Sequence, residues 1–153
     1  MTNHFIFFHV GDITLPSLLV KTIRKFNPDS KIHFLTDKIT KDIDNVDETF
    51  RLDLDRNFIM LSRYEIFSKY KFTDPALYID TDMLLLRPID IDIFSDKDVY
   101  LCQRESNCNE KFNHNFNGLD FIEYKDKMIG DIYPFIGCFI YTKNYKFWED
   151  CYC

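Results

Sequence analysis

Apolar and polar segments alternate along the first part of the chain at spacings that predict strands and helices in turn. An apolar run over 5–10 is followed, after Pro16, by a segment whose apolar residues recur at helical spacing, and 31–35 forms a second apolar run. A strand, a helix and a strand in this order favour two parallel strands in one sheet. The polar segment 38–49 is expected to form a loop or a short helix.

The alternation continues to the end of the chain. Further expected elements are strands over 50–54, 76–79, 99–102 and 138–142, and helices over 58–71 and 145–153. The Asn-rich stretch 103–118 is expected to be an exposed loop. Strands and helices that alternate in this way predict an α/β fold built on one sheet.

Length and composition favour one compact domain spanning 1–153. The chain has 153 residues, of which 46% are hydrophobic, with 16 Phe and 9 Tyr but only 4 Gly and 5 Pro. A chain of this size can bury a sizeable core, and its apolar content argues against disorder.

Charge and cysteine usage narrow the class of protein further. A net charge of −6 provides no basic field for a polyanion, so nucleic acid is not expected as the main partner. No apolar run has the length of a membrane span and the N-terminus lacks a signal-peptide pattern, so we expect no integral membrane segment and a cytoplasmic location. The 5 cysteines show no metal-binding spacing and are expected to be reduced thiols.

The acidic pair Asp80 and Asp82 is the strongest candidate for chemistry. Asp-x-Asp occurs at other places in the chain, but only this pair lies between apolar runs on both sides, over 76–79 and 83–86. Burial of unpaired carboxylates costs roughly several kcal/mol, so a compensating cation is expected there. The alternative is a solvated junction between a strand and a turn, in which the two side chains cap backbone amides.

A second candidate is Arg63, which a helical wheel places in the middle of an apolar stripe. The apolar residues within about 60° of it are Ile59, Met60, Ile66, Phe67 and Tyr70. An arginine that points into a core must be paired, and its guanidinium suits a carboxylate or a phosphate. A salt bridge to Asp12, Asp37 or Asp80 and a role at a diphosphate both remain open.

Polar residues follow three of the expected strands. Gly11 and Asp12 follow the first, Asp37 the second, and the acidic pair the strand over 76–79. In open α/β sheets the ligand crevice lies outside the carboxyl ends of the strands, so these residues are expected to converge. Asp12 and Asp37 would then hydrogen-bond a ribose or a base, and Gly11 would let the ligand approach the backbone closely. For each residue alone, a role in a turn is the alternative.

Several of these segments resemble one known family, the nucleotide-sugar glycosyltransferases of the GT-A fold, most closely the family 8 type that includes glycogenin and bacterial surface-glycan galactosyltransferases. The segments that carry the resemblance are 9–19, 23–28, 34–37, 61–64, 77–90 and 136–140, with Trp148 downstream. The resemblance implies a Rossmann-like three-layer sandwich with a mostly parallel central sheet. It implies transfer of a sugar, from a UDP-sugar donor, to a hydroxyl of a saccharide or glycoconjugate acceptor.

The resemblance also implies roles for individual residues. Asp80 and Asp82 would act in catalysis by binding Mn²⁺ or Mg²⁺, which bridges the donor diphosphate, and Arg63 would organise the diphosphate side of the pocket. The remaining residues expected to bind the donor are His9, Val10, Gly11, Asp12, Asp37, Tyr78, Thr81 and Gly137.

The chain also departs from the family pattern. No His occurs after His114, whereas the family supplies a metal-binding His near its C-terminus, and Gly137 replaces a small polar residue. The cation then relies on two carboxylates, phosphates and water, or His114 supplies a ligand, or the chain is a truncated or minimal version. An inactive nucleotide-sugar-binding relative is one alternative function. A DxD phosphatase is another, although Leu84 stands where that chemistry expects Thr or Val.

Overall fold

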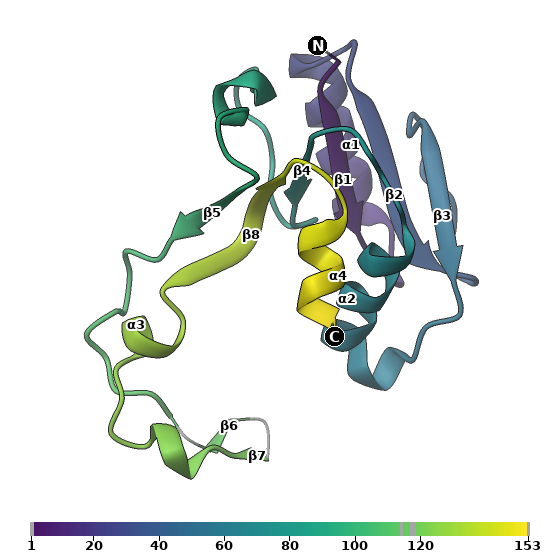
Figure 1. Ribbon diagram of the computed structural model, residues 1–153. Coiled ribbons are helices and arrows are strands. Elements are labelled where there is room, and N and C mark those ends of the chain that lie inside the picture. Colours follow the sequence, from purple (N-terminus) through teal and green to yellow (C-terminus); the bar gives the residue numbers. More distant parts are fainter. Residues whose placement is uncertain (1, 114, 117–118, 153) are drawn as a thin grey trace. The chain divides into compact units, whose positions relative to one another are not determined.

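The computed structural model describes residues 2–113, 115–116 and 119–152 (Figure 1). Its contacts divide the chain into two compact units, one formed by Met1–Tyr100 with Phe139–Cys153 and the other by Leu101–Cys138. The strands are β1 (His4–Phe8), β2 (Lys31–Asp37), β3 (Glu48–Leu52), β4 (Ala76–Ile79), β5 (Val99–Gln103), β6 (Asn115–Phe116), β7 (Leu119–Asp120) and β8 (Phe135–Thr142). The α-helices are α1 (Thr14–Phe26), α2 (Ile59–Lys69), α3 (Ile129–Ile132) and α4 (Lys146–Tyr152), and the 3-10 turns are η1 (Arg56–Phe58), η2 (Ile91–Phe94) and η3 (Ile122–Tyr124).

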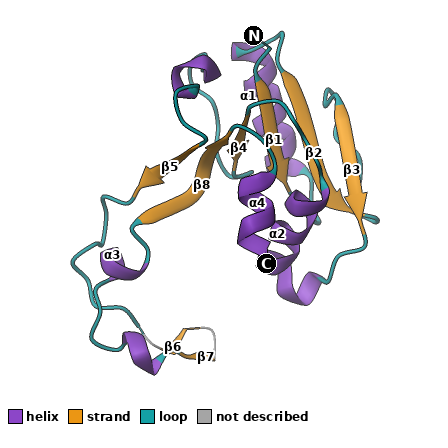
Figure 2. Ribbon diagram, viewed as in Figure 1, coloured by secondary structure: helices purple, strands orange, loops and turns teal. Residues whose placement is uncertain are grey.

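A mostly parallel sheet of 6 strands, in the order β3-β2-β1-β4-β8-β5, organises the fold (Figure 2). β1 pairs in parallel with β2 and with β4, and β2 pairs in parallel with β3. β8 runs antiparallel to β4. The predicted α/β class and the mostly parallel sheet are therefore confirmed.

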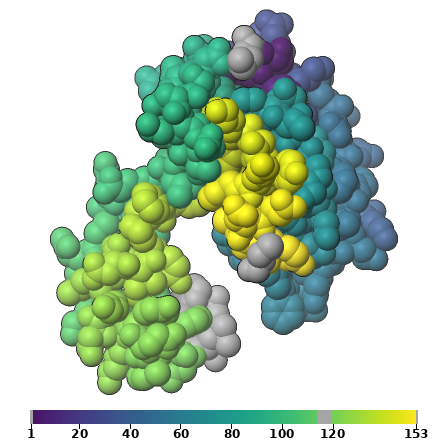
Figure 3. Space-filling model, in the orientation of Figure 1, coloured from purple at the N-terminus to yellow at the C-terminus, as the bar shows by residue number. Residues whose placement is uncertain are grey.

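Helices cover both faces of this sheet, because side chains alternate between the two faces along each strand. On one face, Phe5 and Phe7 of β1 share a buried cluster with Leu19 and Ile23 of α1. On the other, α2 and α4 pack together (Figure 1). Tyr78 of β4 contacts Phe67 of α2 and Trp148 of α4 there. The space-filling view shows the yellow C-terminal residues packed against the teal segment that contains α2 (Figure 3).

Two expectations about apolar residues are wrong. In the run over 83–86 only Leu85 is buried, and Leu86 is 84% exposed, because the chain turns after β4 and 83–86 has no strand partner. The turn is closed by the amide of Met83, which donates to the carbonyl of Asp80 at 3.2 Å. On α2, Met60 is exposed although the wheel placed it on the apolar stripe, because the first turn of the helix extends beyond the sheet core.

The unit Leu101–Cys138 is built around aromatic side chains. Phe112 lies with its ring centroid 6.2 Å from that of Tyr124 and 5.9 Å from that of Tyr133. Within the expected loop over 103–118, Asn115–Phe116 forms strand β6, which pairs with β7. Gly130 allows a close approach of two segments, because a Cβ added there would lie 2.9 Å from the Cβ of Cys108.

Two further findings concern the described residues as a whole. None of their helices combines the length and the apolar character that a membrane crossing requires. Within the described range Cys102, Cys108 and Cys151 are free thiols.

Candidate functional site

The carboxyl ends of β1, β2 and β4 meet at one edge of the sheet, because the three strands are parallel neighbours. Direct contacts join the segments that follow them. His9 Nδ1 lies 3.2 Å from Thr81 Oγ1, which links the end of β1 to the end of β4. The amide of Gly11 donates to Thr40 Oγ1 at 2.9 Å, which links β1 to the turn after β2. The expected convergence of these segments is therefore present in the structure.

A pocket of about 200 Å³ lies at this edge. It is lined by Phe8, His9, Val10, Ile59, Met60, Arg63, Tyr78 and Asp80. Five of these residues were predicted from the sequence to contact a ligand. The helical wheel places Ile59 and Met60 on the apolar stripe, so the sequence predicts them in the core. These two pocket residues are missed because a helical wheel does not show how far the start of a helix extends beyond the sheet.

Arg63 is buried and approaches Asp80 of the acidic pair. Its Nη1 donates to the Tyr78 hydroxyl at 3.2 Å and lies 3.7 Å from Asp80 Oδ1, so Asp80 is the partner among the three carboxylates considered. Its Nη2 donates to the Tyr64 hydroxyl at 3.4 Å. Its Nε is buried and has no hydrogen-bond partner among the described residues. An unmet buried donor is costly, by roughly 1–3 kcal/mol, and so favours an acceptor supplied by a ligand.

Asp80 and Asp82 are more exposed than the sequence suggested. The Asp80 side chain is 34% exposed, and Asp82 is exposed at the turn after β4. In the described part of the chain no three His, Cys, Asp or Glu side chains group closely enough to hold a metal, and His114 lies outside the described residues. Two carboxylates at a solvent-facing edge fit a hard divalent cation whose remaining ligands are phosphate and water oxygens.

Both carboxylate oxygens of Asp37 accept hydrogen bonds from other residues of the protein. Its Oδ1 accepts hydrogen bonds from the amides of Ile39 and Thr40 at 3.2 and 2.8 Å, and its Oδ2 accepts one from Arg56 Nε at 2.6 Å. Burial opposes ionisation, but the hydrogen bonds from Thr40 and Arg56 outweigh it and hold the pKa of Asp37 below its ordinary value. The contacts with Ile39 and Thr40 are those of a turn residue, which was the alternative role for Asp37. A contact between Asp37 and a nucleoside stays a prediction. No sequence pattern singled out Arg56 as the partner.

The other predicted residues lie in different surroundings. Asp12 is exposed and accepts a hydrogen bond from the amide of Thr14 at 2.9 Å, at the start of α1. Hydrogen bonds from Thr14 hold the pKa of Asp12 below its ordinary value. Gly11 has φ of 107°, a conformation that other residues rarely adopt. Gly137 belongs to β8 within the unit Leu101–Cys138, and its role stays a prediction.

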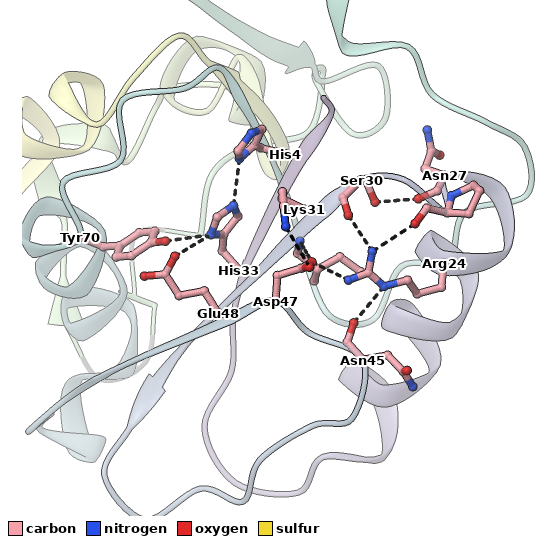
Figure 4. A network of polar contacts seen from close by, with 12 residues as sticks. His4, Arg24, Asn27, Ser30, Lys31, His33, Asn45, Asp47, Glu48 and Tyr70 are labelled. Carbon is pink, nitrogen blue, oxygen red and sulfur yellow. Dashed lines mark hydrogen bonds and ion pairs between the residues drawn. The ribbon is translucent and has the colours of Figure 1, made fainter. Parts of the chain in front are cut away.

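A second polar network lies at the opposite, amino ends of the strands (Figure 4). His4, at the start of β1, contacts His33 of β2, whose other ring nitrogen lies 2.8 Å from the Tyr70 hydroxyl. Beside it, Arg24 of α1 donates to the carbonyl of Ser30 at 2.6 Å and pairs with Asp47. This network ties α1 and the strands together and is separate from the pocket.

Comparison with known proteins gives a result at the level of structure alone. No protein-family model matches the chain, and no curated protein matches its sequence. The apo-form glycosyltransferase GlyE of Streptococcus pneumoniae TIGR4 superposes with a TM-score of 0.54 at 15% identity, over 98% of this chain and 36% of GlyE. The galactosyltransferase LgtC, solved with donor and acceptor sugar analogs, superposes with a TM-score of 0.56 at 17% identity, over 96% of this chain and 59% of LgtC.

The chain has the GT-A glycosyltransferase fold. At 15–17% identity these structures show the shared fold alone. The chain spans about a third of the length of GlyE and about three fifths of that of LgtC. The GT-A fold places a pocket with Arg63 and Asp80 at the carboxyl ends of its parallel strands, where α/β folds bind ligands.

Proposed function

We propose that this GT-A chain binds a nucleotide sugar, with UDP-sugar as the donor, and transfers the sugar to a hydroxyl of a saccharide or glycoconjugate in the synthesis of a glycan. The observation that carries the proposal is the pocket in which the buried guanidinium of Arg63 and the carboxylate of Asp80 face the same space. A cationic and an anionic group side by side suit a diphosphate that arrives with a divalent metal ion.

In this proposal Asp80 and Asp82 hold Mn²⁺ or Mg²⁺. When bound, the ion would neutralise the charge that develops on the departing nucleoside diphosphate without the need for a titrating side chain. The protein side chains supply oxygen ligands from one exposed turn, which lies at the end of a buried strand. β4 ends directly before Asp80, whose carboxylate contacts Tyr78 and Arg63.

Arg63 would hold the diphosphate. Its unpartnered Nε is a donor that no described residue satisfies, and phosphate oxygens are acceptors that match a guanidinium. His9 and Val10, at the end of β1, line the same pocket and would contact the nucleoside. The hydrogen bond between His9 and Thr81 keeps this wall of the pocket next to the acidic turn.

A transfer assay tests the proposal. Purified protein is incubated with UDP- and GDP-sugars and Mn²⁺, and sugar transfer or slow hydrolysis of the donor is measured. We expect Asp80→Asn to reduce turnover by about a hundredfold or more, since removal of one group that stabilises transition-state charge has effects of this order. The matched control is Asp44→Asn, which alters an exposed Asp of another Asp-x-Asp pair.

The outcomes separate the candidate functions. Turnover that Asp80→Asn removes and Asp44→Asn preserves supports the proposal. Nucleotide binding without transfer or hydrolysis of any donor would instead identify an inactive relative. Release of phosphate from simple phosphomonoesters would favour the DxD phosphatase.

A further inference from the structure

The side chain of Tyr78 connects the two charged groups of the pocket. Its hydroxyl donates a hydrogen bond to Asp80 Oδ1 and accepts one from Arg63 Nη1 at 3.2 Å. Arg63 also approaches Asp80 Oδ1, at 3.7 Å. Both contacts fall on the same carboxylate oxygen, and Oδ2 receives no hydrogen bond from the described residues.

The position of this hydroxyl is fixed by the fold. Tyr78 is 3% exposed and lies in β4, paired with Ile6 of β1 on one side and with Ile140 of β8 on the other. Its ring packs edge-on against Phe67 and Trp148, with centroids 5.3 and 5.5 Å away. A tyrosine held by two strands and two aromatic rings cannot move its hydroxyl without repacking the core.

A second tyrosine provides an internal comparison. The Tyr64 hydroxyl accepts a hydrogen bond from Arg63 Nη2 at 3.4 Å, and the guanidinium lies 5.2 Å from the Tyr64 ring centroid. No contact between Tyr64 and Asp80 occurs in the described structure. The two hydroxyls therefore share Arg63 as a neighbour, and only that of Tyr78 reaches the carboxylate.

We propose that Tyr78 is a positioning residue that orients the Asp80 carboxylate, so that Oδ1 faces the protein and Oδ2 faces the pocket for a divalent cation. The inference rests on the proposed function and assigns Tyr78 an indirect role in place of direct contact with the donor. Groups that hydrogen-bond to a metal-ligating carboxylate fix its orientation, and their loss weakens metal binding by about ten- to hundredfold.

Titration of Mn²⁺ in the presence of UDP, followed by electron paramagnetic resonance of the free ion, tests this role without any turnover. Tyr78→Phe keeps the ring between Phe67 and Trp148 and removes only the hydroxyl. We expect it to weaken Mn²⁺ binding by about tenfold or more. Tyr64→Phe, which removes a hydroxyl beside the same guanidinium, is expected to change Mn²⁺ binding by less than about twofold.

Urea unfolding of Tyr78→Phe separates positioning from a general loss of stability. If Tyr78 orients Asp80, Tyr78→Phe weakens Mn²⁺ binding although the protein stays fully folded under the conditions of the titration. Equal or tighter Mn²⁺ binding by Tyr78→Phe, or an equal loss of binding in Tyr64→Phe, would overturn the inference while leaving the proposed function in place. If the wild-type chain binds Mn²⁺ no better with UDP than without it, the proposed function itself fails.

Discussion

At the scale of single residues, the two histidines at the amino ends of β1 and β2 form an unusual contact. His4 Nδ1 lies 3.0 Å from His33 Nε2, with the ring planes only 11° apart (Figure 4). One proton fits between the two nitrogens, and a second would place two N–H groups head to head. The other nitrogen of His33 faces the Tyr70 hydroxyl at 2.8 Å and Glu48 at 3.4 Å. The neighbouring imidazole of His4 therefore disfavours protonation of His33.

This contact predicts a loss of stability in acid. Burial and His4 lower the pKa of His33, although Glu48 and Asp47 act in the opposite direction. The unfolded chain binds a proton at this residue near pH 6.5, and the folded chain resists it, so the free energy of unfolding should fall as pH falls below about 6.5. Urea unfolding of the wild type and of His33→Gln between about pH 8 and pH 5 measures the difference. Parallel pH profiles for the two proteins would contradict this account.

The sequence predicted the burial of Arg63 but not the hydrogen-bond partner of Asp37. The helical wheel correctly placed Arg63 in a buried position, because helical periodicity fixes the direction of a side chain. The partner of Asp37 could not be predicted, since Arg56 lies in a 3-10 turn with no repeating pattern. Long-range partners of polar side chains depend on loop paths, which short patterns do not specify.

At the scale of elements, α4 acts as a cover for one face of the sheet. Its Trp148 is 1% exposed and stacks on Phe67 of α2, with ring centroids 4.2 Å apart. The same indole meets the edge of Tyr78, so α4 supports the strand that ends at the acidic pair. The short helix contributes mainly through this one large side chain.

Replacement of Trp148 by Ala is expected to lower the free energy of unfolding by about 3–5 kcal/mol, because it removes a large aromatic side chain from a packed interior. Phe147→Ala is the matched control, since Phe147 lies next to it on the same helix and is only half-buried. Chemical denaturation followed by circular dichroism measures both variants. A loss for Trp148→Ala no larger than that for Phe147→Ala would show that α4 does not anchor the sheet.

The pattern of strands and helices was readable from the sequence, with one informative failure. Apolar runs such as those of β1 and β4 became buried strands because they lie centrally in the sheet. The equally apolar run over 83–86 did not, since the turn after Asp80 carries it away from any strand partner. Hydrophobicity predicts that a segment tends to be buried, but sheet register decides whether it is.

At the scale of the whole molecule, the site is a consequence of parallel strand order. β1 and β4 are neighbours in the sheet, although helices α1 and α2 and strands β2 and β3 lie between them in the sequence. Their common direction brings His9 and Val10 beside Asp80, and α2 adds Arg63 to the same pocket. The convergence could be predicted from the rule for α/β sheets, whereas the pocket walls contributed by Ile59 and Met60 required the structure.

Calorimetric titration of the wild-type chain with UDP, with and without Mn²⁺, tests most directly whether this pocket binds a metal-bridged diphosphate. Two carboxylates at one turn and a buried arginine with an unmet donor predict that UDP binds at least about tenfold more tightly when Mn²⁺ is present. Asp80→Asn should abolish that difference. Absence of UDP binding under both conditions, or binding of equal strength with and without Mn²⁺, would contradict the account.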